Sequence, residues 1–174
     1  MMDRQLSSSM ASWEAESGMA SRCGGVDCVF LSCFDHNALF LASMLGQGGI
    51  RLHRAHTAEM ADFLLLATRG TVLLSDTTFL DGSWEDALAM IRTVHPLVAT
   101  VICADLIDAE FVASAQERGA FAVLWRPVEL EQLRSRIRAA DELTRERRLW
   151  LAERGRGHER QSDQKFVPEF QWKR

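Results

Sequence analysis

Lysine is nearly missing from this sequence, because only Lys165 and Lys173 occur among its 174 residues. Long apolar stretches are also missing, since runs such as 63–67 and 98–104 are far shorter than the roughly 18 residues that cross a bilayer. Residues 1–25 lack the basic start and apolar core of a secretory signal peptide. These absences argue against a membrane span and against export, and we expect a cytoplasmic protein.

The cysteines and the charge balance exclude two further classes of site. Four cysteines are present, and their spacing matches no paired C-x-x-C zinc site: Cys23, Cys28, Cys33 and Cys103. In the cytoplasm they are expected to stay reduced, so we expect no disulfide framework. The net charge is -4, and residues 141–174 hold nine Arg or Lys against seven Asp or Glu. Such a small basic excess does not predict a nucleic-acid partner.

The sequence divides into three parts by composition. Residues 1–25 are rich in Ser, Met, Gly and Ala and predict a disordered leader. Residues 26–140 alternate short apolar runs with amphipathic segments, which predicts one folded domain. Residues 141–174 predict a helical extension followed by a flexible tail. A chain of this length buries one good core, so we expect a single domain.

The central part contains five units in which a strand is followed by a helix. The expected strands are 26–32, 50–55, 71–75, 98–103 and 121–125. The expected helices lie before the glycine-rich turn 46–49, at 58–68 after the N-cap Thr57, at 83–94, from Asp108 to Gly119, and at 128–140 with a continuation towards Ala152. Alternation of this kind predicts an α/β fold with a parallel sheet, helices on both faces and a site at the carboxyl ends of the strands.

Short motifs follow the predicted strands in a recurring order. In chain order they are Asp76 after TVLLS, Asp81-Gly82 before a helix, Cys103-Ala104 after VI, Gly119-Ala120 before the fifth strand and Arg126-Pro127 after it. In this order and spacing, residues 26–140 resemble the receiver domain of bacterial response regulators, the CheY-like proteins of two-component signalling. The resemblance implies a flavodoxin-like fold: a doubly wound, five-stranded parallel sheet with strand order 2-1-3-4-5.

The resemblance also implies a chemistry for the site. Asp76 stands where the family has its phosphoacceptor, and there Mg²⁺ and a lysine neutralise the transferring phosphoryl group. The family binds the metal through an acidic pair just after the first strand. We interpret Cys33 and Phe34 as occupying those positions, and neither side chain supplies the oxygen ligands that Mg²⁺ requires. We therefore expect no cofactor; if Mg²⁺ binds at all, Asp35 and Asp76 are its candidate ligands.

Other positions depart from the family in the same direction. Cys103, followed by Ala104, replaces the hydroxyl that binds the phosphoryl group, and a thiol is a weak donor. Val123 stands in place of the aromatic residue whose rotation reports activation. Arg126 replaces the conserved lysine, and its guanidinium differs from an ammonium in size and geometry. An ion pair of Arg126 with Asp76 could occupy the pocket permanently.

These observations favour an atypical member of the family, a pseudo-receiver that acts as a protein-interaction module and not as an enzyme. Its partner would be a histidine kinase or another signalling protein. One alternative is a phosphorylatable single-domain response regulator that accepts phosphate on Asp76. A second is a small flavodoxin-like ligand-binding protein, although CFDHN after the first strand is not a phosphate-binding loop.

The last helix raises the question of self-association. Leu130, Leu133, Ile137 and Ala140 form an apolar stripe, which Thr144 and Arg147 interrupt. A long coiled coil is therefore not expected. A homodimer through the last strands and helices stays open.

Overall fold

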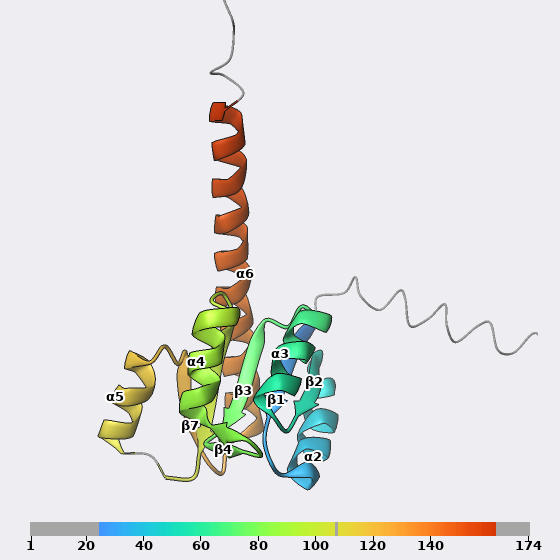
Figure 1. The fold of residues 1–174 in the computed structure, drawn as a ribbon. Helices are drawn as coiled ribbons and strands as arrows, with labels where there is room; N and C mark the ends of the chain where they lie inside the picture. The colour runs from blue at the N-terminus through green and yellow to red at the C-terminus, as the bar shows by residue number, and fades with distance from the viewer. Residues whose placement is uncertain (1–24, 107, 163–174) are drawn as a thin grey trace, which may run out of the picture.

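The computed structural model describes residues 25–106 and 108–162. The predicted leader up to residue 24 and the predicted tail from residue 163 lie outside this part of the chain. The elements are, in chain order, β1 (Val26–Leu31), α2 (Asp35–Gly46), β2 (Ile50–Ala55), α3 (Ala58–Ala67), β3 (Val72–Asp76), β4 (Thr78–Phe79), β5 (Gly82–Ser83), α4 (Trp84–Val94), β6 (Ala99–Ala104), α5 (Ala109–Glu117), β7 (Ala122–Trp125) and α6 (Leu130–Ser162). Strands and helices alternate as the sequence predicts (Figure 1).

The main sheet has five parallel strands in the order β2-β1-β3-β6-β7. Because β4 and β5 form a separate two-stranded antiparallel sheet, β6 and β7 are the fourth and fifth strands of the main one. The predicted order 2-1-3-4-5 is thus confirmed. The order reverses between β1 and β3, so this sheet has its topological switch point beside the end of β3.

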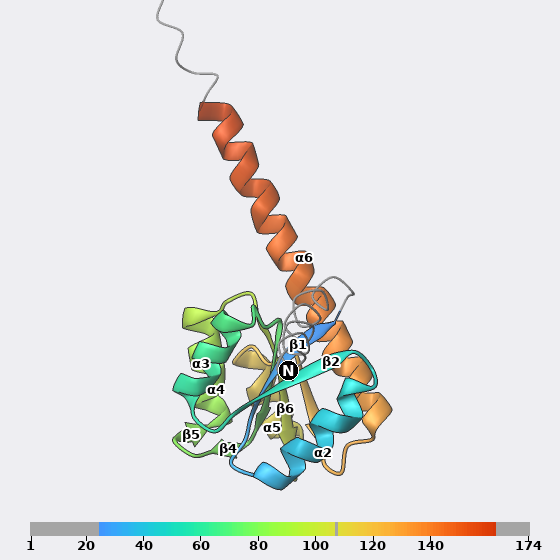
Figure 2. The same ribbon diagram turned by 90° about the vertical axis from the view of Figure 1, so that its right-hand side faces the viewer.

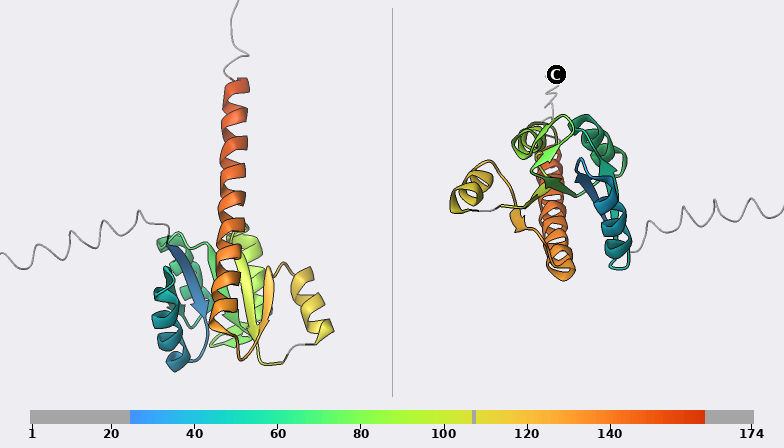
Figure 3. Two further views of the ribbon diagram at one scale, coloured as in Figure 1. Left: turned by 180° about the vertical axis from the view of Figure 1, so that it is seen from behind. Right: turned by 90° about the horizontal axis from the view of Figure 1, so that it is seen from below.

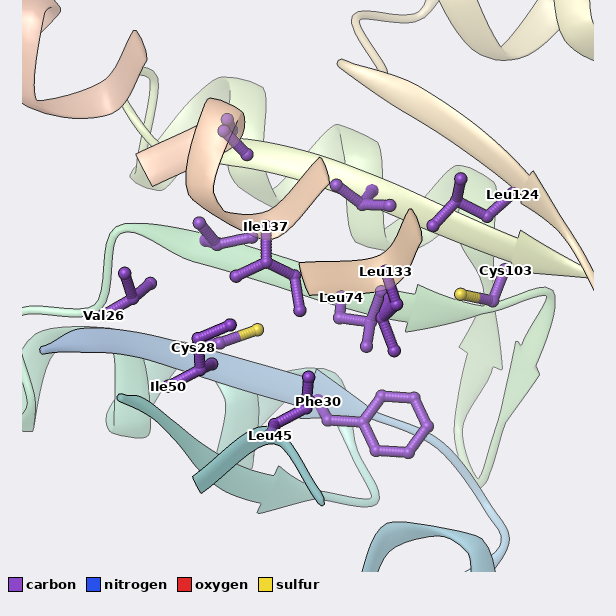
Figure 4. Close-up of a cluster of buried hydrophobic side chains, with 14 residues drawn as sticks. Val26, Cys28, Phe30, Leu45, Ile50, Leu74, Cys103, Leu124, Leu133 and Ile137 are labelled. Carbon is purple, nitrogen blue, oxygen red and sulfur yellow. The ribbon is translucent and has the colours of Figure 1, made fainter. Parts of the chain in front are cut away.

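Two hydrophobic clusters cover the two faces of the sheet. One contains Phe30, Leu74 and Val101 with residues of α2 and α6 such as Leu45 and Ile137 (Figure 4). The other contains strand residues of the opposite face together with residues of α3 and α4. All five residues of β3 and all six of β6 are buried, as expected for strands covered on both sides. Figure 2 shows α3 and α4 on one side of the sheet and α2 and α6 on the other.

Local signals place the helix ends. The side chains of Thr57 and Asp108 accept hydrogen bonds from the N–H groups of Met60 and Phe111. The predicted N-cap Thr57 is thereby confirmed, and Asp108 is the N-cap of the helix expected to begin there. On α3, Ala61 and Leu65 are buried, whereas Phe63 is largely exposed. Because α3 (AEMADFLLLA) is apolar on nearly every side, its periodicity does not specify which face packs.

The β4–β5 hairpin was not predicted, since residues 77–82 read as a loop in the sequence. Its turn is fixed by close packing: a Cβ on Gly82 would lie 2.9 Å from both Asp86 Oδ2 and the ring of Phe79. Asp81 in this turn accepts a hydrogen bond from the N–H of Ala58 at the start of α3. The hairpin therefore ties the end of β3 to the neighbouring helix.

Helix α6 is 33 residues long, about 50 Å at the usual helical rise, and it extends past the sheet (Figures 1 and 3). Four arginines on α6 donate hydrogen bonds to backbone carbonyls of the body: Arg134 to Met44, Arg138 to Gly48, Arg145 to Gly25 and Arg148 to Gly70. The contacts of α6 with the body therefore continue past residue 140, where the sequence placed the end of the folded domain.

Thr144 joins α6 to the amino ends of two central strands. Its hydroxyl donates to Thr71 O at 2.7 Å and accepts from Ala99 N at 3.1 Å, and the residue is fully buried. The residue that interrupts the apolar stripe in the sequence is thus a buried polar anchor whose hydrogen-bonding groups are used.

We predict that Thr144→Val lowers the free energy of unfolding by about 2 kcal/mol, because valine keeps the volume but removes the buried hydroxyl that bonds Ala99 N and Thr71 O, which then keep only their long mutual contact of 3.4 Å. Urea unfolding followed by circular dichroism measures the change. Thr93→Val on the exposed side of α4 is the matched control, since its hydroxyl bonds only to carbonyls of its own helix. Equal effects of the two variants would contradict the anchoring role of Thr144.

Candidate functional site

The candidate site lies at the carboxyl ends of β1, β3, β6 and β7. Asp76 is the last residue of β3, and its register partner on β6 is Cys103. Leu31 at the end of β1 pairs with Ser75, so Ser32 is the next residue along beside Asp76. Since neighbouring parallel strands in register direct paired side chains to the same face, Ser32, Asp76 and Cys103 lie on one side of the sheet.

Ser32 is the closest neighbour of Asp76 on the β1 side. Its hydroxyl donates a hydrogen bond of 2.5 Å to Asp76 Oδ2 and accepts one of 3.1 Å from the N–H of Phe34. The backbone of Ser32 is fixed as well, because its N–H donates to Ala55 O and its carbonyl contacts His56 Nδ1. Ser32 is 3 % exposed, so this polar group reaches Asp76 from a rigid and buried position.

Arg126 approaches Asp76 from the other side. It follows β7 and precedes Pro127, with a cis peptide bond between them, and its N–H donates to Ala104 O at 2.9 Å. Its Nη2 forms an ion pair with Asp76 Oδ1. The side chain of Arg126 is 27 % exposed and that of Asp76 only 5 %. The ion pair that the sequence suggested is therefore present, and the guanidinium compensates an almost fully buried carboxylate.

The second contact of Arg126 is much weaker. Its Nη1 lies 3.9 Å from Asp105 Oδ1, and the Asp105 side chain is 76 % exposed. Burial lowers the pKa of the Arg126 guanidinium, an effect that the nearby Cys33 partly offsets. Arginine still stays protonated at neutral pH because its ordinary pKa is so high. A full positive charge therefore lies against Asp76.

The residues predicted to face Asp76 from the first strand are placed differently. Cys33 is exposed with a free thiol, and Phe34 is 51 % exposed at the N-cap of α2. The side chain of Asp35, the first residue of α2, lies outside the described part of the structure. The structure thus places Ser32, one position earlier than Cys33-Phe34, in hydrogen-bond contact with Asp76. The register of β1 with β3 explains the shift.

The remaining predicted residues lie on β6 and β7. Cys103 is buried against the core cluster that contains Phe30 and Leu124 (Figure 4), and burial raises its pKa to about 12. Its sulfur is therefore a neutral thiol. Ala104 is buried and contributes its carbonyl to Arg126. Val123 is half-buried and pairs with Ile102, on the opposite face of the strand from Leu124.

The described groups around Asp76 do not suit Mg²⁺, the metal that the resemblance implies. Magnesium prefers a near-octahedral set of oxygen ligands, whereas Asp76 meets a hydroxyl that donates to one oxygen and a guanidinium on the other. Among the side chains that the structure describes, which do not include those of Asp35 and His36, no three His, Cys, Asp or Glu groups lie so that they could hold a metal ion. What this arrangement does chemically is pair both oxygens of Asp76 with groups of the protein, the Ser32 hydroxyl and the Arg126 guanidinium.

Comparison with known proteins identifies the fold. No protein-family model matches the sequence, and no curated protein matches it either. The fold matches solved receiver domains with TM-scores above 0.5. One is a receiver domain protein from Clostridium thermocellum, with a TM-score of 0.62 and 20% identity; the match covers 71% of this chain and 98% of that one. Another is the receiver domain of the Francisella response regulator 1452, with a TM-score of 0.64 and 18% identity, covering 69% of this chain and 99% of that one. A third is the chemotaxis protein CheY4 of Vibrio cholerae, with a TM-score of 0.60 and 13% identity, covering 67% of this chain and 99% of that one.

These similarities confirm the receiver-like, flavodoxin-like fold that the motifs predicted. At such low identity they concern the fold alone.

None of the described helices combines the length and the apolar character of a bilayer-spanning segment.

We predict that Arg126→Met lowers the free energy of unfolding by about 3 kcal/mol at neutral pH, because it leaves the Asp76 carboxylate buried without its cation. Adding Asp76→Asn to this variant should recover part of the loss, because the uncompensated charge is then gone. Chemical denaturation of the single and double variants measures both effects.

Arg118→Met is the matched control for this prediction. Arg118 pairs with Glu85 at 3.2 Å, and both side chains are about half exposed (50% and 47%). An exposed pair contributes less than about 1 kcal/mol. Similar losses for Arg126→Met and Arg118→Met, or additive effects of Arg126→Met and Asp76→Asn, would show that Asp76 does not depend on Arg126.

Proposed function

We propose that this chain is an atypical receiver, a pseudo-receiver that works as a cytoplasmic protein-interaction module in two-component signalling without metal-dependent phosphoryl transfer. The observation that carries the proposal is the state of Asp76: Ser32 donates to one of its oxygens and Arg126 pairs with the other. The residue that stands at the phosphoacceptor position is thereby engaged on both sides by the protein itself.

Phosphoryl transfer to Asp76 would have to overcome this arrangement. An attacking carboxylate needs a free oxygen aimed at the phosphorus atom, and the developing charge needs compensation by a metal ion and a cation. Here the Ser32 hydroxyl takes the place of an acidic ligand, and the guanidinium that could compensate the charge already holds the carboxylate. Catalysis therefore forms no part of the proposal, and neither does a cofactor.

A pocket that is occupied permanently favours a single conformation. Receiver switching depends on a second state that the phosphoryl group stabilises, and Val123 and the buried Cys103 lack the groups that would bias such a state. The protein would then convey a signal by binding its partner through its surface, and the amount of protein present would set the strength of that signal. We infer a protein partner, either a histidine kinase or another signalling protein, and no nucleic acid.

The second candidate function is a phosphorylatable single-domain response regulator. One observation favours it: Asp76 is retained at the end of β3 beside the switch point of the sheet, where a phosphoacceptor would lie. The ligand-binding alternative has less support, because the segment between β1 and α2 contains no glycine.

We predict that the chain gains no phosphoryl group when incubated with Mg²⁺ and acetyl phosphate, and that Mg²⁺ with beryllium fluoride causes no NMR shifts around Asp76. Intact mass and amide spectra are the measurements. A mass increase that disappears in Asp76→Asn would establish phosphorylation and refute the pseudo-receiver.

A matched gain-of-function variant sharpens this test. Ser32→Asp, Cys33→Asp and Arg126→Lys together place two carboxylates after β1 and an ammonium after β7. We expect Mg²⁺ to shift the amide signals at the ends of β1 and β3 in this variant and to leave them unchanged in the parent chain. Equal Mg²⁺ responses in the two proteins would mean that Ser32 and Arg126 do not limit metal binding.

A further inference from the structure

Where it leaves the body, α6 carries three large apolar side chains that the described structure leaves exposed. Leu149, Trp150 and Leu151 are 63%, 52% and 46% exposed, and because they are consecutive they point to different sides of the helix. On one side of the helix a groove of about 390 Å³ runs between α6 and the segment before β6, lined by Leu97, Leu143, Glu146, Arg147, Trp150 and Leu151. An exposed tryptophan beside an apolar groove is a feature of interaction surfaces.

The half of α6 that projects past the body is not expected to form a stable helix on its own. The hydrogen bonds from α6 to the body end at Arg148, and the helix continues to Ser162. This segment contains Gly155 and Gly157, each of which costs about 1 kcal/mol in a helix relative to alanine. Isolated helices shorter than about 12–15 residues are marginal in water. A packing partner for the segment would supply the missing stability.

One face of this helix has the spacing of a helix-pairing stripe. Counted from Trp150, the other positions lie three, four or seven residues away in either direction, so they share one side of the helix: Leu143, Glu146, Arg147, Trp150, Glu153, Arg154 and Gly157. Four of them, Leu143 to Trp150, also line the groove. The stripe and the groove are therefore parts of the same surface.

The charges on this face are self-complementary about Trp150. Glu146 lies four residues before Trp150 and Arg154 four residues after it, while Arg147 lies three before and Glu153 three after. In an antiparallel pair of identical helices crossing at Trp150, Glu146 of each copy would face Arg154 of the other, and Arg147 would face Glu153. A parallel pair would instead bring Glu146 against Glu146 and Arg154 against Arg154.

The uncharged positions fit the same pairing. Trp150 would lie on the twofold axis and stack on its own copy, and Arg154, whose guanidinium carbon lies 4.0 Å from the centre of the Trp150 ring, would extend the stack. Leu143 would face Gly157, where the absence of a side chain allows a close approach of the partner backbone. The groove beside Leu97 and Leu143 would then receive the end of the partner helix.

We propose that this surface binds a second copy of the chain and forms a twofold dimer through an antiparallel pair of α6 helices centred on Trp150. The contact is isologous, since the same residues of both copies meet, and it therefore closes at two chains. Self-complementary charge is the reason to choose a second copy over an unrelated protein, which would have no cause to match the order Glu, Arg, Trp, Glu, Arg. The dimer leaves the end of the sheet that carries Asp76 exposed for a signalling partner.

Sedimentation velocity of the full chain over a range of concentrations tests the proposal. We expect a monomer–dimer equilibrium that Trp150→Ala shifts strongly towards the monomer. Glu146→Arg and Arg154→Glu should each weaken the dimer about tenfold, because two exposed attractive pairs become repulsive. The double variant Glu146→Arg with Arg154→Glu restores opposite charges across the axis and should recover the dimer.

Circular dichroism of each variant checks that the body stays folded, and Glu110→Arg on the exposed side of α5 is a control that should leave the equilibrium unchanged. A chain that is monomeric at every concentration overturns the proposal and leaves the groove to a different protein. A dimer that persists in Glu146→Arg, or that the double variant fails to recover, contradicts the antiparallel pairing about Trp150.

Discussion

The described site is built around one requirement, that the charge of the buried Asp76 carboxylate be compensated. Asp76 ends a strand that is buried along its whole length, and a bare charge there would be costly. Ser32 and Arg126 both meet it, one from the neighbouring strand β1 and the other from the far side of β6. These two contacts connect the carboxyl ends of the sheet, and the proposed pseudo-receiver function rests on them.

Much of the fold could be predicted because it depends on patterns that the sequence carries directly. Apolar runs of strand length and the cap Thr57 were enough to place strands and helices, and the strand order followed from the resemblance that the order of the motifs carries. The inward face of α3 was not predictable from periodicity, since that helix is apolar all round. The β4–β5 hairpin depends on packing around Gly82, which only the tertiary structure reveals.

In the site, the end of β3 was identified from sequence and the end of β1 was not. Asp76 and Arg126 were named because they stand at the ends of clear strands, at the positions where the resemblance implies a phosphoacceptor and a lysine. Ser32 was missed because the end of β1 is ambiguous by one residue, and a shift of one residue changes which side chain faces the pocket. The hydroxyl of Thr144 was read as an interruption of a stripe, although its buried partners make it an anchor.

If Ser32 and Arg126 keep Asp76 unavailable to metal and phosphoryl groups, a crystal of the chain grown with magnesium and beryllium fluoride will contain neither ligand at Asp76. We expect Asp76 in that crystal still to accept from Ser32 and to pair with Arg126. Beryllium fluoride attached to Asp76 beside a six-coordinate magnesium ion, with Arg126 displaced, would contradict this expectation.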